Sequence, residues 1–418
     1  MEKIVDFELY NVALFLLNQR EYLNIPMKSV AVDLDTSLST ISRIENMKMP
    51  VNNITFDKML TLYQIERKDL EQANKEYKHY LYLSLDEICR SVDVISNLEK
   101  GLLDLDEKYG NIKIPISLIN HFVIYVFLFG DGQLNVTNVK KMEQLAEQLE
   151  DKISFYSLFV QKIIYIFLAE MHFHKRNHII AYDFLMKAKQ TYNSIGKYDV
   201  LLYSCLLKTE PKTEGAFLFY DYYAKYNNLC IQYNLSNRLI IGKINYGIFL
   251  RNMGLFEQAL ENDIACFDNS LKESNIHNFY YVLLNNIGLD YKFLGSYDKA
   301  IEYFNECLTY WNDYDTYFEL IYCLYKNNNI LETKNYILII KQKKLEKNIY
   351  YDLILWVDKI VNEKYDDSKK RLLDIYEKYF DKSSRITKRM ILLLLCEQFE
   401  LIEDYQQAYI YAKKLINI

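Results

Sequence analysis

The chain has 418 residues, a formal net charge of −6 and a hydrophobic content of 50%. This composition is sufficient for a large buried core, and the acidic balance excludes a protein that coats nucleic acid along its whole surface. Only 11 glycines and 4 prolines occur, which is too few turn residues for an all-β fold of this length, so we expect an all-α protein.

Residues 1–70 contain five short helical patterns. We expect a first helix at roughly 6–22 and a second that starts after Pro26, since proline is favoured at the first turn of a helix. A tight turn at Asp35-Thr36 then leads to Ser37, which is a suitable N-cap for the next helix. The third and fourth expected helices have the sequences LSTISRIE and TFDKMLTLYQI, and a fifth begins with RKDL.

The stretch LDTSLSTISRIENMK at 34–48 resembles the helix-turn-helix domain of the Xre/Cro type. The matching residues are Ala31, Leu34, Ser37, Ser39, Thr40, Ile41, Ser42, Arg43, Ile44 and Glu45. The resemblance implies that the third helix enters the DNA major groove, where hydroxyls and arginine reach base edges and phosphates. The expected core residues are Val30, Leu34, Ile41 and Ile44, and the expected DNA-binding residues are Lys28, Ser37, Leu38, Ser39, Thr40, Arg43 and Lys48.

This segment departs from the Xre/Cro pattern at two positions. Asp35 replaces the usual turn glycine, although aspartate tolerates a left-handed backbone, and Met27 replaces a polar residue that often contacts phosphate. Residues 1–70 also carry eight Lys and Arg against ten Asp and Glu. Because DNA affinity depends on phosphate neutralisation, one such domain should bind weakly, and a capping bundle without a DNA role is the structural alternative.

The remainder of the chain contains an internal repeat. The segments 244–267 and 284–308 align with an offset of 41 residues, which pairs Gly247 with Gly288 and Ala259 with Ala300. Within each unit a small residue precedes the alanine by 12 positions. This resembles the tetratricopeptide repeat (TPR), in which small residues lie where two antiparallel helices touch. Weaker copies give second-helix anchors at Ala181, Ala216, Ala259, Ala300, Thr333, Ser368 and Ala408.

These patterns predict a division of the chain into three parts. Residues 1–70 form the helix-turn-helix bundle, residues 71–150 form a helical linker with degenerate repeats, and residues 151–418 form a right-handed TPR-like α-solenoid. The concave face of such a solenoid binds extended peptides or helices. Asparagine can pair with a peptide backbone because it carries both a donor and an acceptor. The expected peptide-binding residues are Asn245, Arg251, Asn252, Tyr281, Asn285, Asn286, Lys292 and Tyr322.

An Xre-type domain followed by a TPR-like array resembles the Rap, Rgg, NprR, PlcR and PrgX group of peptide-pheromone regulators of Gram-positive bacteria. The resemblance covers essentially the whole chain. It implies a homodimeric cytoplasmic transcription factor whose partners are a double-stranded DNA operator and a short signalling peptide, in a quorum-sensing response such as sporulation, virulence, competence or conjugation. The alternatives are a Rap-like protein that sequesters or dephosphorylates a response regulator, and a TPR adaptor that does not bind DNA.

Catalytic motifs are not evident in the sequence. There is no GxGxxG, Walker loop, GxSxG or HExxH, so we expect neither an enzyme nor a cofactor. His172, His174 and His178 are close in sequence, but metal binding needs further ligands and we expect no metal site. The seven cysteines include no CxxC pair, the start of the chain is acidic, and the apolar run at 122–130 is too short to span a membrane, so we expect a cytoplasmic protein without a membrane partner.

Overall fold

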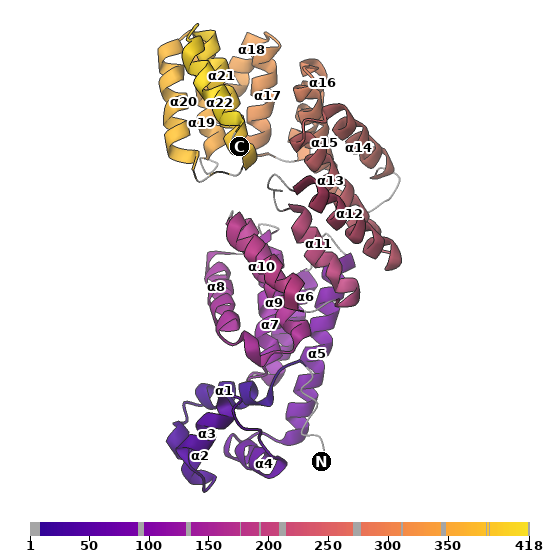
Figure 1. Ribbon diagram of the computed structural model, residues 1–418, viewed down its shortest axis with the longest axis vertical. Coiled ribbons are helices and arrows are strands. Elements are labelled where there is room, and N and C mark those ends of the chain that lie inside the picture. Colours follow the sequence, from indigo (N-terminus) through magenta and orange to yellow (C-terminus); the bar gives the residue numbers. More distant parts are fainter. Residues whose placement is uncertain are drawn as a thin grey trace. The chain divides into compact units, whose positions relative to one another are not determined.

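The computed structural model consists of helices grouped into two compact units, Met1–Leu239 and Ile240–Ile418. It describes residues 9–90, 96–130, 135–175, 177–191, 194–208, 215–270, 277–310, 312–343, 348–381, 383 and 385–416. These residues form 22 α-helices and two short 3₁₀ turns (Figure 1). Within the same ranges the extended pairing is limited to one isolated antiparallel bridge, between Tyr10 and Tyr156. The predicted all-α class is therefore confirmed.

Unit 1 contains the N-terminal helices. In chain order they are α1 Val12–Tyr22, α2 Met27–Asp33, α3 Leu38–Glu45, α4 Asn53–Leu62, α5 Arg67–Arg90, α6 Ser96–Tyr109, α7 Pro115–Gly130, α8 Val136–Asp151, η1 Ile153–Phe155, α9 Leu158–His174, α10 His178–Thr191, η2 Gly196–Tyr198, α11 Asp199–Lys208 and α12 Gly215–Gln232. We call residues 9–66 the head and residues 67–239 the body of this unit.

The first helix begins later than the sequence pattern predicted. Residues 6–8 lie outside the described residues, and α1 starts only at Val12, where Asn11 caps it by accepting a hydrogen bond from the N–H of Ala13 at 2.9 Å. The residues just before the cap are extended because their backbone pairs with a distant segment: the N–H of Asn11 donates to the carbonyl of Phe155 at 2.6 Å. Residues 9–11 are not helical, so the predicted start near residue 6 was wrong. A local periodicity cannot reveal pairing with so distant a segment.

The long helix α5 joins the head to the body. Its 24 residues bury one stripe, at a spacing of three or four residues, that includes Leu70, Tyr77, Leu81 and Ile88, as expected for an amphipathic helix packed along one side. At its C-terminal end the guanidinium of Arg238 donates to the carbonyls of Ile88 and Cys89. Arg238 therefore satisfies backbone acceptors that lack partners within the helix.

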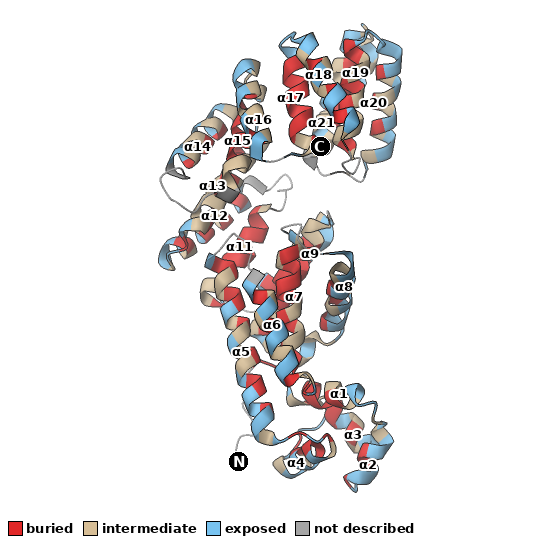
Figure 2. Cartoon of the chain, turned by 180° about the vertical axis from the view of Figure 1, so that it is seen from behind, coloured by how far each residue is buried: buried red, intermediate tan, exposed pale blue. Residues whose placement is uncertain are grey.

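Unit 2 continues the chain as helix pairs. The helices are α13 Ser236–Asn252, α14 Phe256–Ser270, α15 His277–Phe293, α16 Tyr297–Tyr310, α17 Tyr314–Lys326, α18 Ile330–Gln342, α19 Ile349–Val361, α20 Tyr365–Tyr379, α21 Arg385–Leu401 and α22 Tyr405–Leu415. Helix α13 begins at the end of unit 1. Figure 2 shows that α17 is buried along most of its length, because α16, α18 and α19 all pack against it.

The predicted small anchors lie where the second helix of a pair packs. Each described anchor is the fourth residue of its helix, and all six are buried; the side chain of Ala216 lies outside the described residues. The six are Ala181, Ala259, Ala300, Thr333, Ser368 and Ala408. A small side chain at this position lets the two helix backbones approach closely.

In the described part of the chain, no helix has both the length and the apolar character needed to cross a bilayer.

Candidate functional site

The turn between α2 and α3 has the geometry that the sequence predicted. Asp35 adopts a left-handed conformation with φ +49°, so it does take the place of a turn glycine. Ser37 caps α3, because its Oγ accepts a hydrogen bond from the N–H of Thr40 at 3.0 Å. The predicted core is also present: Val30, Leu34, Ile41 and Ile44 are all buried. The two helices therefore cross over an apolar contact and leave the opposite face of α3 toward solvent.

The outward face of α3 carries the predicted DNA-binding residues. Leu38 is 50% exposed, and the side chains of Ser39 and Arg43 are exposed and have no partner among the described residues. Ser37 and Thr40 are already engaged, since their hydroxyl oxygens lie 2.9 Å apart. The two other predicted residues, Lys28 in α2 and Lys48 just after α3, are also exposed. Ser39 and Arg43, one helical turn apart, are thus the side chains best placed to reach a ligand.

A buried ion pair fixes the far end of α3. Arg20 of α1 contacts Glu45 through two bonds, Nε to Oε1 at 2.6 Å and Nη2 to Oε2 at 2.9 Å. Glu45 is 2% exposed, and Arg20 also donates to the carbonyl of Ile25 at 3.1 Å. A two-point contact of this kind restricts orientation as well as distance. Glu45 matches the Xre/Cro pattern in the sequence, but its partner Arg20 was not predicted.

The two best repeats differ in what packs against their small residue. A Cβ placed on Gly288 would lie 2.7 Å from Cε1 of Phe304, so the aromatic ring occupies that space. A Cβ on Gly247 would lie 2.0 Å from Oδ1 of Asp263, which holds the equivalent position 41 residues earlier. Asp263 is fully buried. A carboxylate therefore stands where the next repeat has an aromatic core residue.

Arg251 neutralises part of this buried charge. Its Nη2 lies 2.8 Å from Oδ2 of Asp263 and its Nε lies 2.6 Å from Oδ1 of Asp290. Both carboxylates are inaccessible to solvent, and burial raises the pKa of Asp263 to about 7 and also raises the pKa of Asp290. One guanidinium thus serves two carboxyl groups. Arg251 was expected in a peptide groove and neither of its partners was predicted, although an aspartate at an aromatic repeat position was a usable signal.

Two further residues expected in the groove are likewise engaged within unit 2. Lys292 forms an ion pair with Glu319, and both side chains are about nine-tenths buried. Tyr322 is 6% exposed and its hydroxyl donates to Glu397 at 2.7 Å. These side chains link α15 to α17 and α17 to α21.

Two of the four expected asparagines have a buried polar atom without a hydrogen-bond partner among the described residues. Asn245, Asn252 and Asn285 are half-buried, as is Tyr281, whereas Asn286 is 5% exposed. Oδ1 of Asn285 and Nδ2 of Asn286 are buried and have no hydrogen-bond partner among the described residues. Buried polar atoms in native proteins are nearly always paired, so these two unpaired atoms of consecutive residues call for an explanation. A peptide bond supplies one donor and one acceptor.

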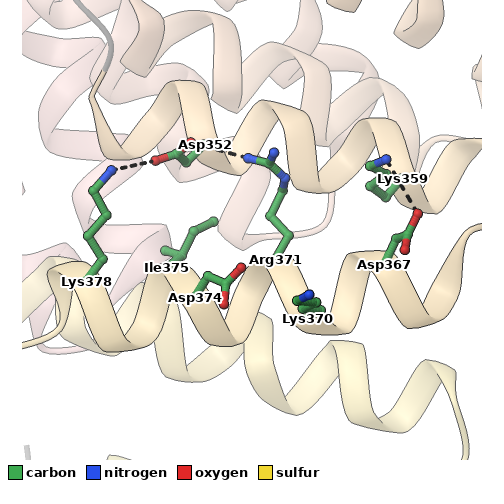
Figure 3. Close-up of a pocket in the computed structure, with 8 residues that line it drawn as sticks. All are labelled: Asp352, Lys359, Asp367, Lys370, Arg371, Asp374, Ile375 and Lys378. Carbon is green, nitrogen blue, oxygen red and sulfur yellow. Dashed lines mark hydrogen bonds and ion pairs between the residues drawn. The ribbon is translucent and has the colours of Figure 1, made fainter.

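A shallow cleft of about 370 Å³ lies between α19 and α20 (Figure 3). Arg371 and Lys378 both contact Asp352, at 3.3 and 3.4 Å, and Lys359 contacts Asp367 at 3.5 Å. The remaining lining residues are Lys370, Asp374 and Ile375. The alternating charges link the two helices in a nearly neutral network, so this cleft offers no concentrated charge for a ligand.

In the described residues, no group of three or more His, Cys, Asp and Glu is arranged to hold a metal ion.

Comparison with known proteins gives matches at the level of structure. No protein-family model and no curated protein matches the sequence. The apo form of the quorum sensor NprR from B. thuringiensis is 17% identical, with a TM-score of 0.59 over 84% of this chain and 98% of that one. NprR in complex with its cognate peptide NprX is 14% identical, with a TM-score of 0.60 over the same shares.

A Rap protein complexed with Competence and Sporulation Factor is also similar. It is 14% identical, with a TM-score of 0.61 over 83% of this chain and 97% of that one. At these identities the likeness concerns the fold, and it agrees with the helix pairs and buried anchors described above. The chain has the TPR-like helical-repeat fold of the NprR and Rap structures.

Proposed function

We propose that this chain is a DNA-binding transcriptional regulator that acts as a homodimer and whose repeat region binds a short signalling peptide. The observation that carries the DNA-binding part is the outward face of α3. Ser39 and Arg43 lie exposed on a helix that is capped by Ser37 and held by Arg20 at its other end. A serine and an arginine on such a face can contact base edges and phosphates.

The proposed peptide site is supported by the two unpaired amide atoms of α15. The unpaired Oδ1 of Asn285 can accept from a peptide N–H and the unpaired Nδ2 of Asn286 can donate to a peptide carbonyl. The similar structures bear on the same point, since NprR was solved with the peptide NprX and a Rap protein with Competence and Sporulation Factor. Arg251, Lys292 and Tyr322 support this site by holding its helices together, while Asn245, Asn252 and Tyr281 complete the proposed contact surface.

A dimer is proposed because a single head carries few cations. Phosphate neutralisation supplies much of the affinity of DNA-binding proteins, and two heads on one operator double the number of contacts. The half-sites would lie about one helical turn apart, or a multiple of it.

The test of the DNA-binding proposal is operator selection from genomic DNA, followed by affinity measurements with Arg43→Ala. This change should weaken operator binding by about 1–3 kcal/mol, or roughly 5- to 150-fold. Lys68→Ala is the matched control, since it removes one positive charge from a 77% exposed side chain of α5. A folded Arg43→Ala protein that binds as tightly as the control would refute the role of α3.

The test of the peptide proposal is calorimetry with peptides encoded by adjacent reading frames. Asn285→Ala should weaken binding by about 1–2 kcal/mol, because one peptide N–H loses its acceptor. Asn335→Ala is the control, since Asn335 is exposed on α18. Equal affinities for wild type and Asn285→Ala would remove this residue from the site.

A Rap-like regulator that acts on a response regulator is the second candidate. The observation in its favour is that the Rap complex and the NprR complex match this fold equally well, with TM-scores of 0.61 and 0.60. The exposed α3 face supports the first candidate instead. The deciding measurement is binding to phosphorylated receiver domains compared with binding to genomic DNA fragments under the same conditions.

A further inference from the structure

Helix α1 contacts the rest of unit 1 on two sides. On one side Arg20 holds Glu45 of α3, as described above. On the other side Gln19, which is 1% exposed, reaches the segment between α6 and α7. Its Nε2 donates to the carbonyl of Asn111 at 2.9 Å, and its Oε1 accepts from the N–H of Lys113 at 2.8 Å. The side-chain amide thus pairs with the body backbone through both of its polar atoms.

Further contacts reinforce this attachment. The ammonium of Lys113 lies 4.0 Å from the ring centroid of Tyr22, one turn beyond Gln19. Ahead of α1, the N–H of Ser157 donates to the carbonyl of Leu9 at 2.9 Å, and Asn11 donates in the opposite direction to Phe155. Figure 1 shows α1 between α3 and the body helices of unit 1. The head is therefore held by α1 as well as by its covalent continuation into α5.

We propose that Gln19 is a positioning residue that clamps the head onto the body and thereby fixes the separation of the two half-sites that a dimer recognises. This inference rests on the proposed DNA-binding function. The amide pairs with backbone groups of a turn and is shielded from water, so its two hydrogen bonds keep their direction. Since Gln19 and Arg20 are adjacent in one helix, the clamp transmits the position of the body directly to α3.

A clamped head and a tethered head differ in how they tolerate DNA spacing. An inserted base pair both lengthens the separation of two half-sites and rotates one about the DNA axis. Rigidly held heads cannot follow this rotation, whereas heads whose attachment through α1 is loosened can adjust. The clamp therefore controls binding to a paired site and leaves binding to a single half-site unchanged.

The experiment measures the affinity of wild type, Gln19→Ala and the exposed-surface control Gln72→Ala for operators whose half-sites are separated by zero, one or two additional base pairs. Wild type and control should lose about tenfold in affinity per added base pair, and Gln19→Ala less than about threefold, with equal affinities for an isolated half-site. Identical spacing profiles for wild type and a folded Gln19→Ala, or a wild type that tolerates every spacing, would overturn the clamp.

Hydrogen exchange gives a second, DNA-independent measurement. The amides of Lys113 and Ser157 should exchange at least about tenfold faster in Gln19→Ala than in wild type, since the contacts that protect them open more often. Unchanged exchange would overturn the proposal. If wild type bound no DNA at all, the proposed function would fail, while the exchange rates would still decide whether Gln19 holds the head.

Discussion

The buried cluster of Arg251, Asp263 and Asp290 predicts that unit 2 loses stability as the pH rises. In the unfolded chain the Asp263 carboxyl ionises near its usual pKa of 3.8, whereas burial raises this pKa to about 7 in the folded repeat. Between these values the unfolded chain releases a proton that the folded chain retains, so the free energy of unfolding falls with increasing pH. Below about pH 4 the contribution is fully present, and above about pH 7 it is lost.

The change Asp263→Asn tests this reasoning, because an amide of the same size does not ionise. From pH 5 to pH 8, about two pKa units of the interval lie below the folded pKa, and each unit corresponds to about 1.4 kcal/mol. We therefore expect wild type to lose about 3 kcal/mol more than Asp263→Asn across this range. At pH 8 the variant should be the more stable protein, since folding no longer buries a second carboxylate beside one guanidinium.

Urea denaturation followed by tryptophan fluorescence is the appropriate assay, because Trp356 is buried in the core of unit 2. The matched control is Asp268→Asn, an exposed aspartate of the same helix α14. It should follow the wild-type pH dependence. An Asp263→Asn protein that loses as much stability as wild type between pH 5 and pH 8 would refute the assignment of the retained proton to this cluster.

Other measurements test buried pairs and the charge of the head. Arg20→Ala should lower the free energy of unfolding of the head by about 3–5 kcal/mol, because Glu45 would be left buried and unpaired. Thermal unfolding followed by circular dichroism measures this loss, and a loss below about 1 kcal/mol would contradict the expectation. Gln398→Ala should destabilise unit 2 by about 2–4 kcal/mol in urea, because Oε1 of Gln398 accepts from both Trp356 and Ser368 at 2.8 Å. An unchanged urea midpoint would show that the two donors find other partners. The slope of log DNA affinity against log salt concentration should be near −3 per head, about one unit for each of the exposed cations Lys28, Arg43 and Lys48. A slope near zero would exclude phosphate contacts. Sedimentation at micromolar concentration should give a dimer, and a monomer that still protects both half-sites would contradict the proposal.

Local signals in the sequence were sufficient for much of the fold. The left-handed turn at Asp35 and the cap at Ser37 depend on residues within one turn of each other, and both were predicted correctly. The six described anchors also recur at similar intervals along the chain, so the helix pairs that contain them were recognisable from the sequence.

Contacts between distant segments were not predictable in the same way. Arg251 was placed in a groove because nothing in its neighbourhood indicates that Asp290, in the next helix pair, lies 2.6 Å away. The start of α1 was predicted too early because its preceding residues pair with residues 155–157, far along the chain. Ion pairs and backbone pairing of this kind depend on which segments the fold brings together, and a single sequence without its structure does not contain that information in a local pattern.

Because α5 runs without a break from the head into the body, any insertion within this helix would move the head. One added residue turns everything beyond it by about 100° and advances it by about 1.5 Å, so a single insertion would point α3 away from its present direction and pull Gln19 off residues 111–113. Seven added residues restore the helical phase to within about 20° but displace the head by about 10 Å. Insertions in α5 are therefore compatible with the same head orientation only in steps of whole turns, and each step requires a matching extension of the segments that hold α1.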